Sequence, residues 1–260
     1  ALVDGRTTTR ELELNHRYDD GDHNYSVTVT LTDEAGETVE DQLAVTVNNV
    51  APTIALSGAD HSAEGSSYTL TLGAVTDPGM DNVATYRVHW GDGSSDDYAA
   101  GGDVTHVYAD GQEDVVISVD LIDEDGTFLG AGSKALTIDN VAPTIALSGA
   151  DQSAEGSSYT LTLGAVTDPG MDNVATYRVH WGDGSSDDYA AGGDVTHVYA
   201  DGQEDVVISV DLIDEDGTFL GAGSKALTID NVAPTIALSG ADYSAEGSSY
   251  TLTLGAVTDP

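Results

Sequence analysis

The chain of 260 residues contains no cysteine and very few basic side chains. Without cysteine, no disulfide can hold the fold together and no thiol can serve a redox or metal site. Only 7 Lys and Arg stand against 46 Asp and Glu, which gives a formal net charge of −39. Nucleic acids and anionic membrane surfaces are bound through basic side chains, so this charge excludes both as partners. Cations are the partners that such a chain favours.

Long apolar runs are missing as well, and none approaches the roughly 18 residues that cross a bilayer, so we expect no membrane insertion. Hydrophobic residues nevertheless make up 40% of the chain and come in short alternating runs, which a disordered acidic tail would lack. The sequence begins at Ala1 and stops at Pro260 inside a repeat, and we expect it to be an internal piece of a longer protein.

A long repeat organises the chain. The segment VAPTIALSGAD begins at Val50, Val141 and Val232, a period of 91 residues (141 − 50 = 232 − 141 = 91). Residues 50–140 and 141–231 differ only where His61 is replaced by Gln152, and the third copy has Tyr243 there. We expect this variable position to be a solvent-exposed loop site.

The period defines four predicted segments. Residues 1–49 are the C-terminal half of an older copy, 50–140 and 141–231 are full repeats, and 232–260 are the N-terminal part of a further copy. A period this long exceeds that of common solenoids, so each repeat is expected to fold as its own domain. A catalytic site is needed once, whereas near-identical copies favour length, stiffness or multivalent binding, so we expect no enzyme here.

Within a repeat, apolar residues alternate with polar ones at a period of two. Ser67–Leu72 follows this pattern, and Val115–Leu121 places Asp120 on the outer face. Turns rich in Gly and Asp separate the runs. Six or seven short strands in such a length predict an all-β fold of tandem Ig-like antiparallel β-sandwiches, arranged as beads on a string, and no helix.

One signature within the repeat is specific. It comprises Trp90-Gly91-Asp92-Gly93-Ser94, then Thr105-His106-Val107-Tyr108, an alternating strand from Val115, and Asp125-Gly126. This pattern resembles the PKD domain, over both full repeats and, in its second half, over residues 1–49. Many PKD domains carry two residues between the Trp and the GDG turn, and this chain has none. In that respect it resembles a shorter variant of large bacterial surface proteins.

The resemblance implies an Ig-like fold, a bacterial secreted protein at the cell surface or outside the cell, and a role as a spacer or adhesive module. It also implies structural roles for the conspicuous side chains: Trp90 and Trp181 in the core rather than as sugar-stacking platforms, and His106 with Tyr108 in packing. Asp92 is expected to cap its own turn, with metal binding as the alternative.

Acidic loops carry the clearest chemical signal. Calcium takes six to eight oxygen ligands from carboxylates, amides and carbonyls. In an Ig-like topology the loops at 77–82 and 123–126 share one pole, where the preceding linker enters. We therefore predict that Ca2+ binds at the repeat junctions through Asp77, Asp81, Asp123, Asp125, Asp139, Asn140, Asp168, Asp172, Asp214, Asp216, Asp230 and Asn231. The alternative is that these acids are solvated turn residues or fit a saline habitat. No EF-hand pattern is present.

The linkers provide an internal comparison. Asn48-Asn49 stands where the later linker has Asp139-Asn140, so we expect weaker calcium binding near residue 50 than near residue 140.

Two functions of different class follow. The first is a non-catalytic extracellular spacer of a large adhesin or biofilm matrix protein, a monomeric rod whose partners are the neighbouring repeats. Other cell-surface proteins or glycans would then bind through regions outside this segment. The second is a PKD-like accessory module that binds polysaccharide or protein and is attached to an exported hydrolase. Tyr98, Phe128 and Tyr243 are the aromatic candidates for such binding, and they are scattered.

Overall fold

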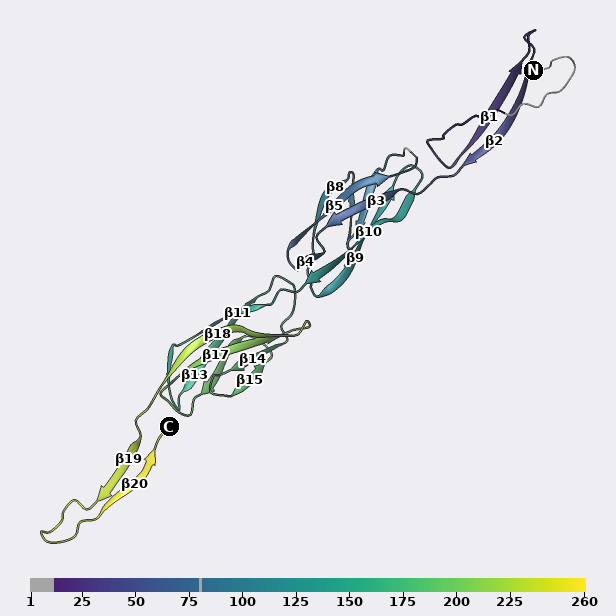
Figure 1. Ribbon diagram of the computed structural model, residues 1–260. Helices are drawn as coiled ribbons and strands as arrows, with labels where there is room; N and C mark the ends of the chain where they lie inside the picture. The colour runs from purple at the N-terminus through teal and green to yellow at the C-terminus, as the bar shows by residue number, and fades with distance from the viewer. Residues whose placement is uncertain (1–11, 80) are drawn as a thin grey trace. The chain divides into compact units, whose positions relative to one another are not determined.

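A computed structural model describes residues 12–79 and 81–260 (Figure 1). All regular secondary structure in these residues is β-strand, which confirms the all-β prediction for the part of the chain described. No helix long and apolar enough to cross a membrane occurs among the same residues.

The two full repeats contain the same eight strands. The first has β3 (Thr53–Gly58), β4 (His61–Ala63), β5 (Ser67–Thr76), β6 (Thr85–His89), β7 (Ser95–Tyr98), β8 (Gly102–Val107), β9 (Glu113–Ile122) and β10 (Thr127–Asp139). The second has β11 (Thr144–Gly149), β12 (Gln152–Ala154), β13 (Ser158–Thr167), β14 (Thr176–His180), β15 (Ser186–Tyr189), β16 (Gly193–Val198), β17 (Glu204–Ile213) and β18 (Thr218–Asp230).

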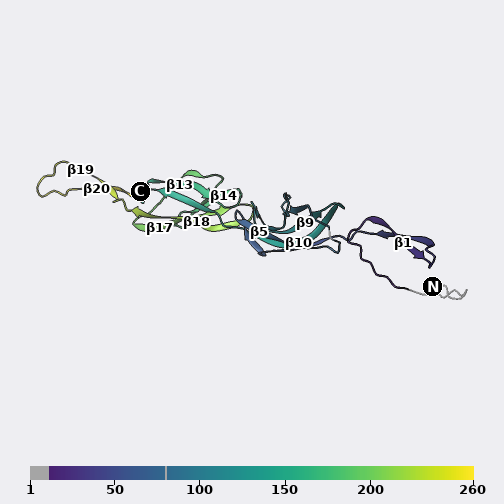
Figure 2. The ribbon, with the colours of Figure 1, turned by 90° about the horizontal axis from the view of Figure 1, so that it is seen from above.

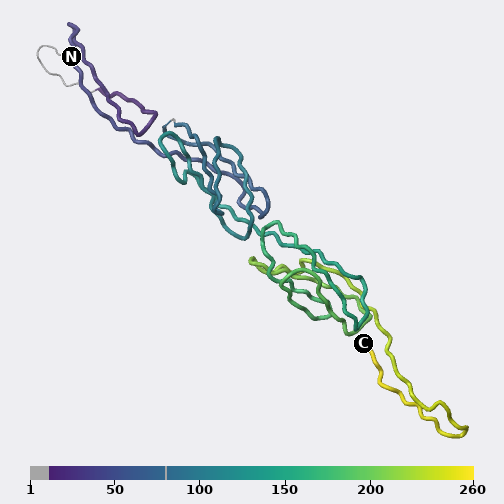
Figure 3. Tube along the Cα trace, turned by 180° about the vertical axis from the view of Figure 1, so that it is seen from behind, coloured from purple at the N-terminus to yellow at the C-terminus, as the bar shows by residue number. Residues whose placement is uncertain are grey.

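Incomplete copies of the repeat form two-stranded hairpins. They are β1 (His23–Thr32) with β2 (Thr38–Val47), and β19 (Thr235–Gly240) with β20 (Leu252–Thr258), each visible in the Cα trace (Figure 3). Apolar side chains that a full repeat would bury are open to solvent here, such as Leu31 at 64% and Leu254 at 63% exposure. A hairpin alone therefore does not bury the repeat's core face.

The chain divides into two compact units. The first reaches to Ser62 and takes in Ser67–His106 and Asp114–Thr137. The second comprises Ala63–Ser66, Val107–Glu113 and Ile138–Pro260. Three short stretches of the first full repeat therefore belong to the same unit as the whole second repeat. The predicted domain boundaries at residues 49/50, 140/141 and 231/232 stay a prediction.

The second repeat is a sandwich of two sheets. One has the order β12-β18-β17-β14-β15 and the other β11-β13-β16, and the first full repeat has the same orders with its own strands. The long strands β17 and β18 run side by side, as Figures 1 and 2 show. Tandem β-sandwiches are thus confirmed. One pair departs from the antiparallel prediction, because β12 joins the edge of its sheet parallel to β18.

Alternation in the strands produces the core. In β13, Tyr159, Leu161 and Leu163 are buried while the Ser and Thr between them are exposed or half-buried. Trp181 and Ile208 have no exposed surface. The buried residues of this repeat form one hydrophobic cluster, so the repeat has a core of its own. Burial of each large apolar side chain stabilises the fold by about 1.5–3 kcal/mol.

The signature residues pack as predicted. Trp90 is fully buried, and the ring of His106 stacks on it with centroids 4.7 Å apart. Asp92 Oδ1 accepts a hydrogen bond from the Ser94 N–H at 2.9 Å, which confirms its turn-capping role. Its other oxygen, Oδ2, lies 2.7 Å from His106 Nε2. These contacts tie the GDG turn to β8.

Two local expectations need correction. His61 and Gln152 are exposed, and Tyr243 is 91% exposed, but His61 and Gln152 begin strands β4 and β12 rather than lying in loops. Asp120, expected on an outer face, is only 6% exposed. Its Oδ1 accepts a hydrogen bond from the Gly130 N–H and its Oδ2 lies 2.8 Å from His89, so hydrogen bonds satisfy the buried carboxylate.

Candidate metal centre

Two acidic loops of the second repeat meet at one place. Asp168 and Asp172, before β14, and Asp214, after β17, each place a carboxylate oxygen within 4.8 Å of the others. We call these three residues the Asp214 cluster. All three were predicted from the sequence, and they come together because successive antiparallel strands return the chain to the same pole.

In Asp168 and Asp214 the two carboxylate oxygens have different surroundings. Asp214 Oδ1 accepts hydrogen bonds from the backbone N–H groups of Asp216 at 2.9 Å and Gly217 at 3.2 Å. Asp168 Oδ1 likewise accepts from Gly170 N–H at 3.1 Å. The Oδ2 atoms of Asp168, Asp172 and Asp214 are buried and have no hydrogen-bond partner. In Asp168 and Asp214, one oxygen therefore closes the turn and the other is left for a ligand.

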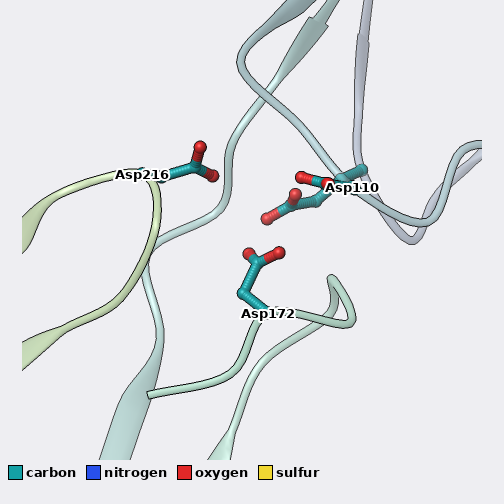
Figure 4. Close-up of side chains that lie close together, drawn as sticks. Asp110, Asp172 and Asp216 are labelled. Carbon is teal, nitrogen blue, oxygen red and sulfur yellow. The ribbon is translucent and has the colours of Figure 1, made fainter. Parts of the chain in front are cut away.

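A second group adjoins the first. Glu64, Asp110, Asp172 and Asp216 also place one oxygen each within 4.8 Å of one another, and we call them the Glu64 cluster. Figure 4 shows the three aspartates of this cluster pointing toward a common space. Asp172 belongs to both clusters. All members of both clusters lie in the second compact unit.

Sequence reasoning missed Glu64 and Asp110. Both lie in turns of the first full repeat: Glu64 directly follows β4, and Asp110 precedes β9. The sequence holds one signal for Glu64, which stands directly before a glycine, Gly65, and the φ of this glycine is +65° in the structure. The acidic residue in such a turn is held by the backbone, which makes it a better ligand candidate than a loop acid free to move.

The first unit holds a related group. Asp20, Asp81 and Asp125 place their oxygens within 4.8 Å of one another, and we call them the Asp20 cluster. By the repeat, they occupy the positions of Asp110, Asp172 and Asp216 in the Glu64 cluster. The same three aspartates thus come together twice in the chain.

Linker residues behave differently from one another. The Asn140 side chain donates a hydrogen bond to Asp216 Oδ2, so it reaches the acidic loop. Asn231 follows Asp230 in the equivalent linker. Asp139 and Asp230 are exposed and belong to none of the three clusters. Asp77 and Asp123 are also outside them, but each has a buried Oδ2 without a hydrogen-bond partner. A metal-binding role for these residues stays a prediction.

The pKa values of carboxyl groups in the Glu64 cluster are raised by burial and by their neighbours. Burial and then the neighbouring Glu64 and Asp168 raise the pKa of Asp172 to about 6. Burial also raises the pKa of Glu64, against the hydrogen bond from Val141 N–H, which lowers it, and nearby aspartates raise it further. Every charged neighbour that shifts the pKa of Asp172 is another carboxylate. This excess negative charge favours binding of a cation.

The chemistry of the donors narrows the class of ion. Each cluster offers only carboxylate oxygens, which are hard ligands suited to Ca2+ and Mg2+ and poorly suited to copper or iron–sulfur chemistry. None of the three clusters contains a histidine or cysteine, so zinc in its usual nitrogen and sulfur coordination does not fit them.

Comparison with known proteins gives fold-level likeness at low identity. No family model matches the chain, and no curated protein matches it. Fibronectin(III)-like modules of CbhA from Clostridium thermocellum match with 15% identity over 69% of this chain and 93% of that one, at a TM-score of 0.29. A tetra-tandem repeat in the extending region of a large adhesion protein matches with 16% identity over 84% of this chain and 59% of that one, at a TM-score of 0.43. At such values, the fold assignment rests on this chain's own sheets.

Proposed function

We propose that this chain is part of a non-catalytic spacer in a large bacterial surface protein of the adhesin or biofilm matrix type. Its repeats are PKD-like, it lies outside the cell, and its immediate partners are the neighbouring repeats. Ca2+ bound by the acidic clusters stiffens the junctions between repeats.

The repetition of one sandwich carries the spacer role. Residues 50–140 and 141–231 form the same eight strands with one amino-acid difference between them. A second copy of a catalytic site adds little, whereas a second copy of a sandwich adds length. The conspicuous side chains also favour a structural role, since Trp90 and Trp181 are fully buried.

The acidic clusters support the calcium role. The Asp214 cluster combines three carboxylates whose Oδ2 atoms are buried without hydrogen-bond partners. Buried charge without a partner is costly, and a divalent cation would compensate it. The Asp110, Asp172 and Asp216 positions of the Glu64 cluster recur in the Asp20 cluster, which fits a device used at each junction.

An accessory module that binds glycans is the alternative. It would need a row of exposed aromatic side chains. Of the three candidates, Tyr243 is exposed but Tyr98 and Phe128 are half-buried, and Trp90 is inaccessible. Retention of the chain on insoluble polysaccharides would favour this alternative.

Small-angle X-ray scattering of the full chain tests the spacer. We expect a monomer whose distribution of interatomic distances becomes longer and narrower when millimolar Ca2+ replaces chelator, because bound ions restrict motion at the junctions. Identical scattering curves with Ca2+ and with chelator would contradict stiffening by calcium. A compact oligomer under both conditions would contradict the spacer function.

A further inference from the structure

Hydrogen bonds with the backbone hold both the main chain and the side chain of Glu64. Its N–H donates to the Asp139 carbonyl at 3.0 Å, and its Oε1 accepts from the Val141 N–H at 2.7 Å. The next residue, Gly65, donates its N–H to the Tyr108 carbonyl at 2.8 Å. These bonds fix both the backbone and one carboxylate oxygen of Glu64 beside residues 139–141.

The second oxygen of Glu64 has no partner. The residue is 0% exposed, and Oε2 is buried without a hydrogen bond. Glu64 Oε2 and Asp172 Oδ2 lie beside the same glycine, because a Cβ at Gly170 would be 2.8 Å from the first atom and 2.9 Å from the second. An unpaired carboxylate oxygen held among other carboxylates is unfavourable unless a cation lies between them.

The chain contains a matched comparison. Glu155 occupies the same position in the second repeat, and its Oε1 accepts from the Val232 N–H at 2.7 Å in the same way. Its Oε2, however, accepts a hydrogen bond from the Gly202 N–H. The equivalent glycine beside Glu64 is Gly111, and Glu64 Oε2 does not take that bond. Glu64 differs in having Asp172 and Asp216 nearby, whereas Glu155 lies in none of the three clusters.

Two glycines leave room at this oxygen. A Cβ at Gly111 would lie 2.6 Å from Glu64 Oε2, and a Cβ at Gly170 would lie 2.8 Å from the same atom. Any side chain at either position would collide with the carboxylate or displace it. The Met171 N–H also donates to the Ala109 carbonyl at 2.9 Å, which holds the loop of Asp172 beside that of Asp110.

We propose that Glu64, Asp110, Asp172 and Asp216 form a divalent-cation site in which Glu64 is the fixed ligand. The site takes Ca2+, because four separate carboxylates without a histidine or cysteine among them suit a hard ion of flexible coordination. This inference rests on the proposed calcium binding and adds two ligands to it. Glu64 then connects residues 139–141 to the bound ion, through Oε1 on one side and Oε2 on the other.

Calorimetric titration of the full chain with CaCl2, after removal of metal by chelator, tests this site. Glu64→Gln keeps an oxygen for the Val141 N–H and removes the charge. We expect it to abolish one binding step or weaken it by about tenfold or more, because ligand charge sets calcium affinity. Glu155→Gln is the matched control and should titrate like the unaltered chain.

Thermal unfolding separates a ligand from a purely structural side chain. In chelator, Glu64→Gln should unfold at the same temperature as the unaltered chain or higher, since a repelling charge is gone. When Ca2+ replaces chelator, the unfolding temperature of this variant should rise less than that of the unaltered chain. The proposal would be overturned if Glu64→Gln unfolded at a lower temperature in chelator and yet showed the same Ca2+-dependent rise as the unaltered chain.

A second pair of variants keeps the test informative if Glu64→Gln does not fold. Asp110→Asn should weaken Ca2+ binding, and Asp201→Asn, at the same position in the second repeat, should not. If Ca2+ binds the chain and neither Glu64→Gln nor Asp110→Asn alters it, this site is wrong while the calcium spacer stands. If the unaltered chain takes up no Ca2+, both the site and the calcium part of the proposed function are wrong.

Discussion

Asp183 shows how one acidic side chain can serve the fold rather than a metal. Its Oδ1 accepts hydrogen bonds from the Ser185 N–H at 2.9 Å and the Ser185 hydroxyl at 2.6 Å, and its Oδ2 lies 2.7 Å from His197 Nε2. Burial opposes ionisation, but these hydrogen bonds outweigh it and lower the pKa of Asp183 to about 2. Unlike the three members of the Asp214 cluster, it has no buried oxygen left without a partner.

The lowered pKa predicts a pH dependence. A carboxyl group whose pKa is lower in the folded state stabilises the fold above its unfolded value of 3.8, and this contribution is lost as the pH falls toward 2. Asp183→Asn should therefore reduce the free energy of unfolding by about 1–2 kcal/mol at pH 7, after allowance for partial exposure. Urea denaturation at pH 7 and at pH 2.5 measures this. The difference between variant and unaltered chain should shrink at the lower pH, and a constant difference would contradict the assignment.

Sequence reasoning succeeded for residues whose role depends on local pattern. The turn cap at Asp92 and the buried Trp90 follow from the GDG turn and from alternation, which are set within a few residues. It failed for Glu64, whose neighbours Asp172 and Asp216 lie far along the chain. It also misplaced Asp120, because hydrogen bonds from distant Gly130 and His89 allow its burial.

At the scale of elements, the turn after β14 depends on two glycines with different surroundings. Gly182 has a φ of +90°, and a Cβ there would lie 2.9 Å from the Val206 Cβ. Gly184 has a φ of +92°, but a Cβ there would meet nothing within 4 Å. Both positions need the backbone freedom of glycine, and only Gly182 also needs the space.

This pair predicts graded losses of stability. Gly184→Ala should cost about 1 kcal/mol through backbone strain alone. Gly182→Ala should cost about 2–4 kcal/mol, because the new methyl group also presses against β17. Urea midpoints of the two variants make the comparison, and equal losses would show that the close approach to Val206 is unimportant.

The strands could be predicted from the sequence, but the parallel pairing of the edge strand β12 could not. Alternation over Ser67–Leu72 and Val115–Leu121 indicates β5 and β9, because each strand buries one face. The parallel pairing of β12 with β18 depends on where the chain crosses from one sheet to the other, and three residues of β12 carry no pattern of their own.

At the scale of the whole molecule, charge dominates. A net charge of −39 on 260 residues opposes any compact state, and the clustered carboxylates concentrate that repulsion at the loops between strands. Cations that bind at these loops relieve it where it is strongest. The stability of this chain is therefore expected to depend on bound calcium.

Thermal unfolding of the full chain at low salt tests this central claim most directly, with chelator, millimolar Ca2+, millimolar Mg2+ and matched NaCl compared. Specific binding at 100-fold excess over Kd stabilises the fold by about 2.7 kcal/mol, which raises the unfolding temperature by several degrees. We predict that rise for Ca2+ and a much smaller one for Mg2+ and NaCl. Equal rises in Ca2+, Mg2+ and NaCl would mean that the acids are a solvated surface, and the metal sites would be wrong.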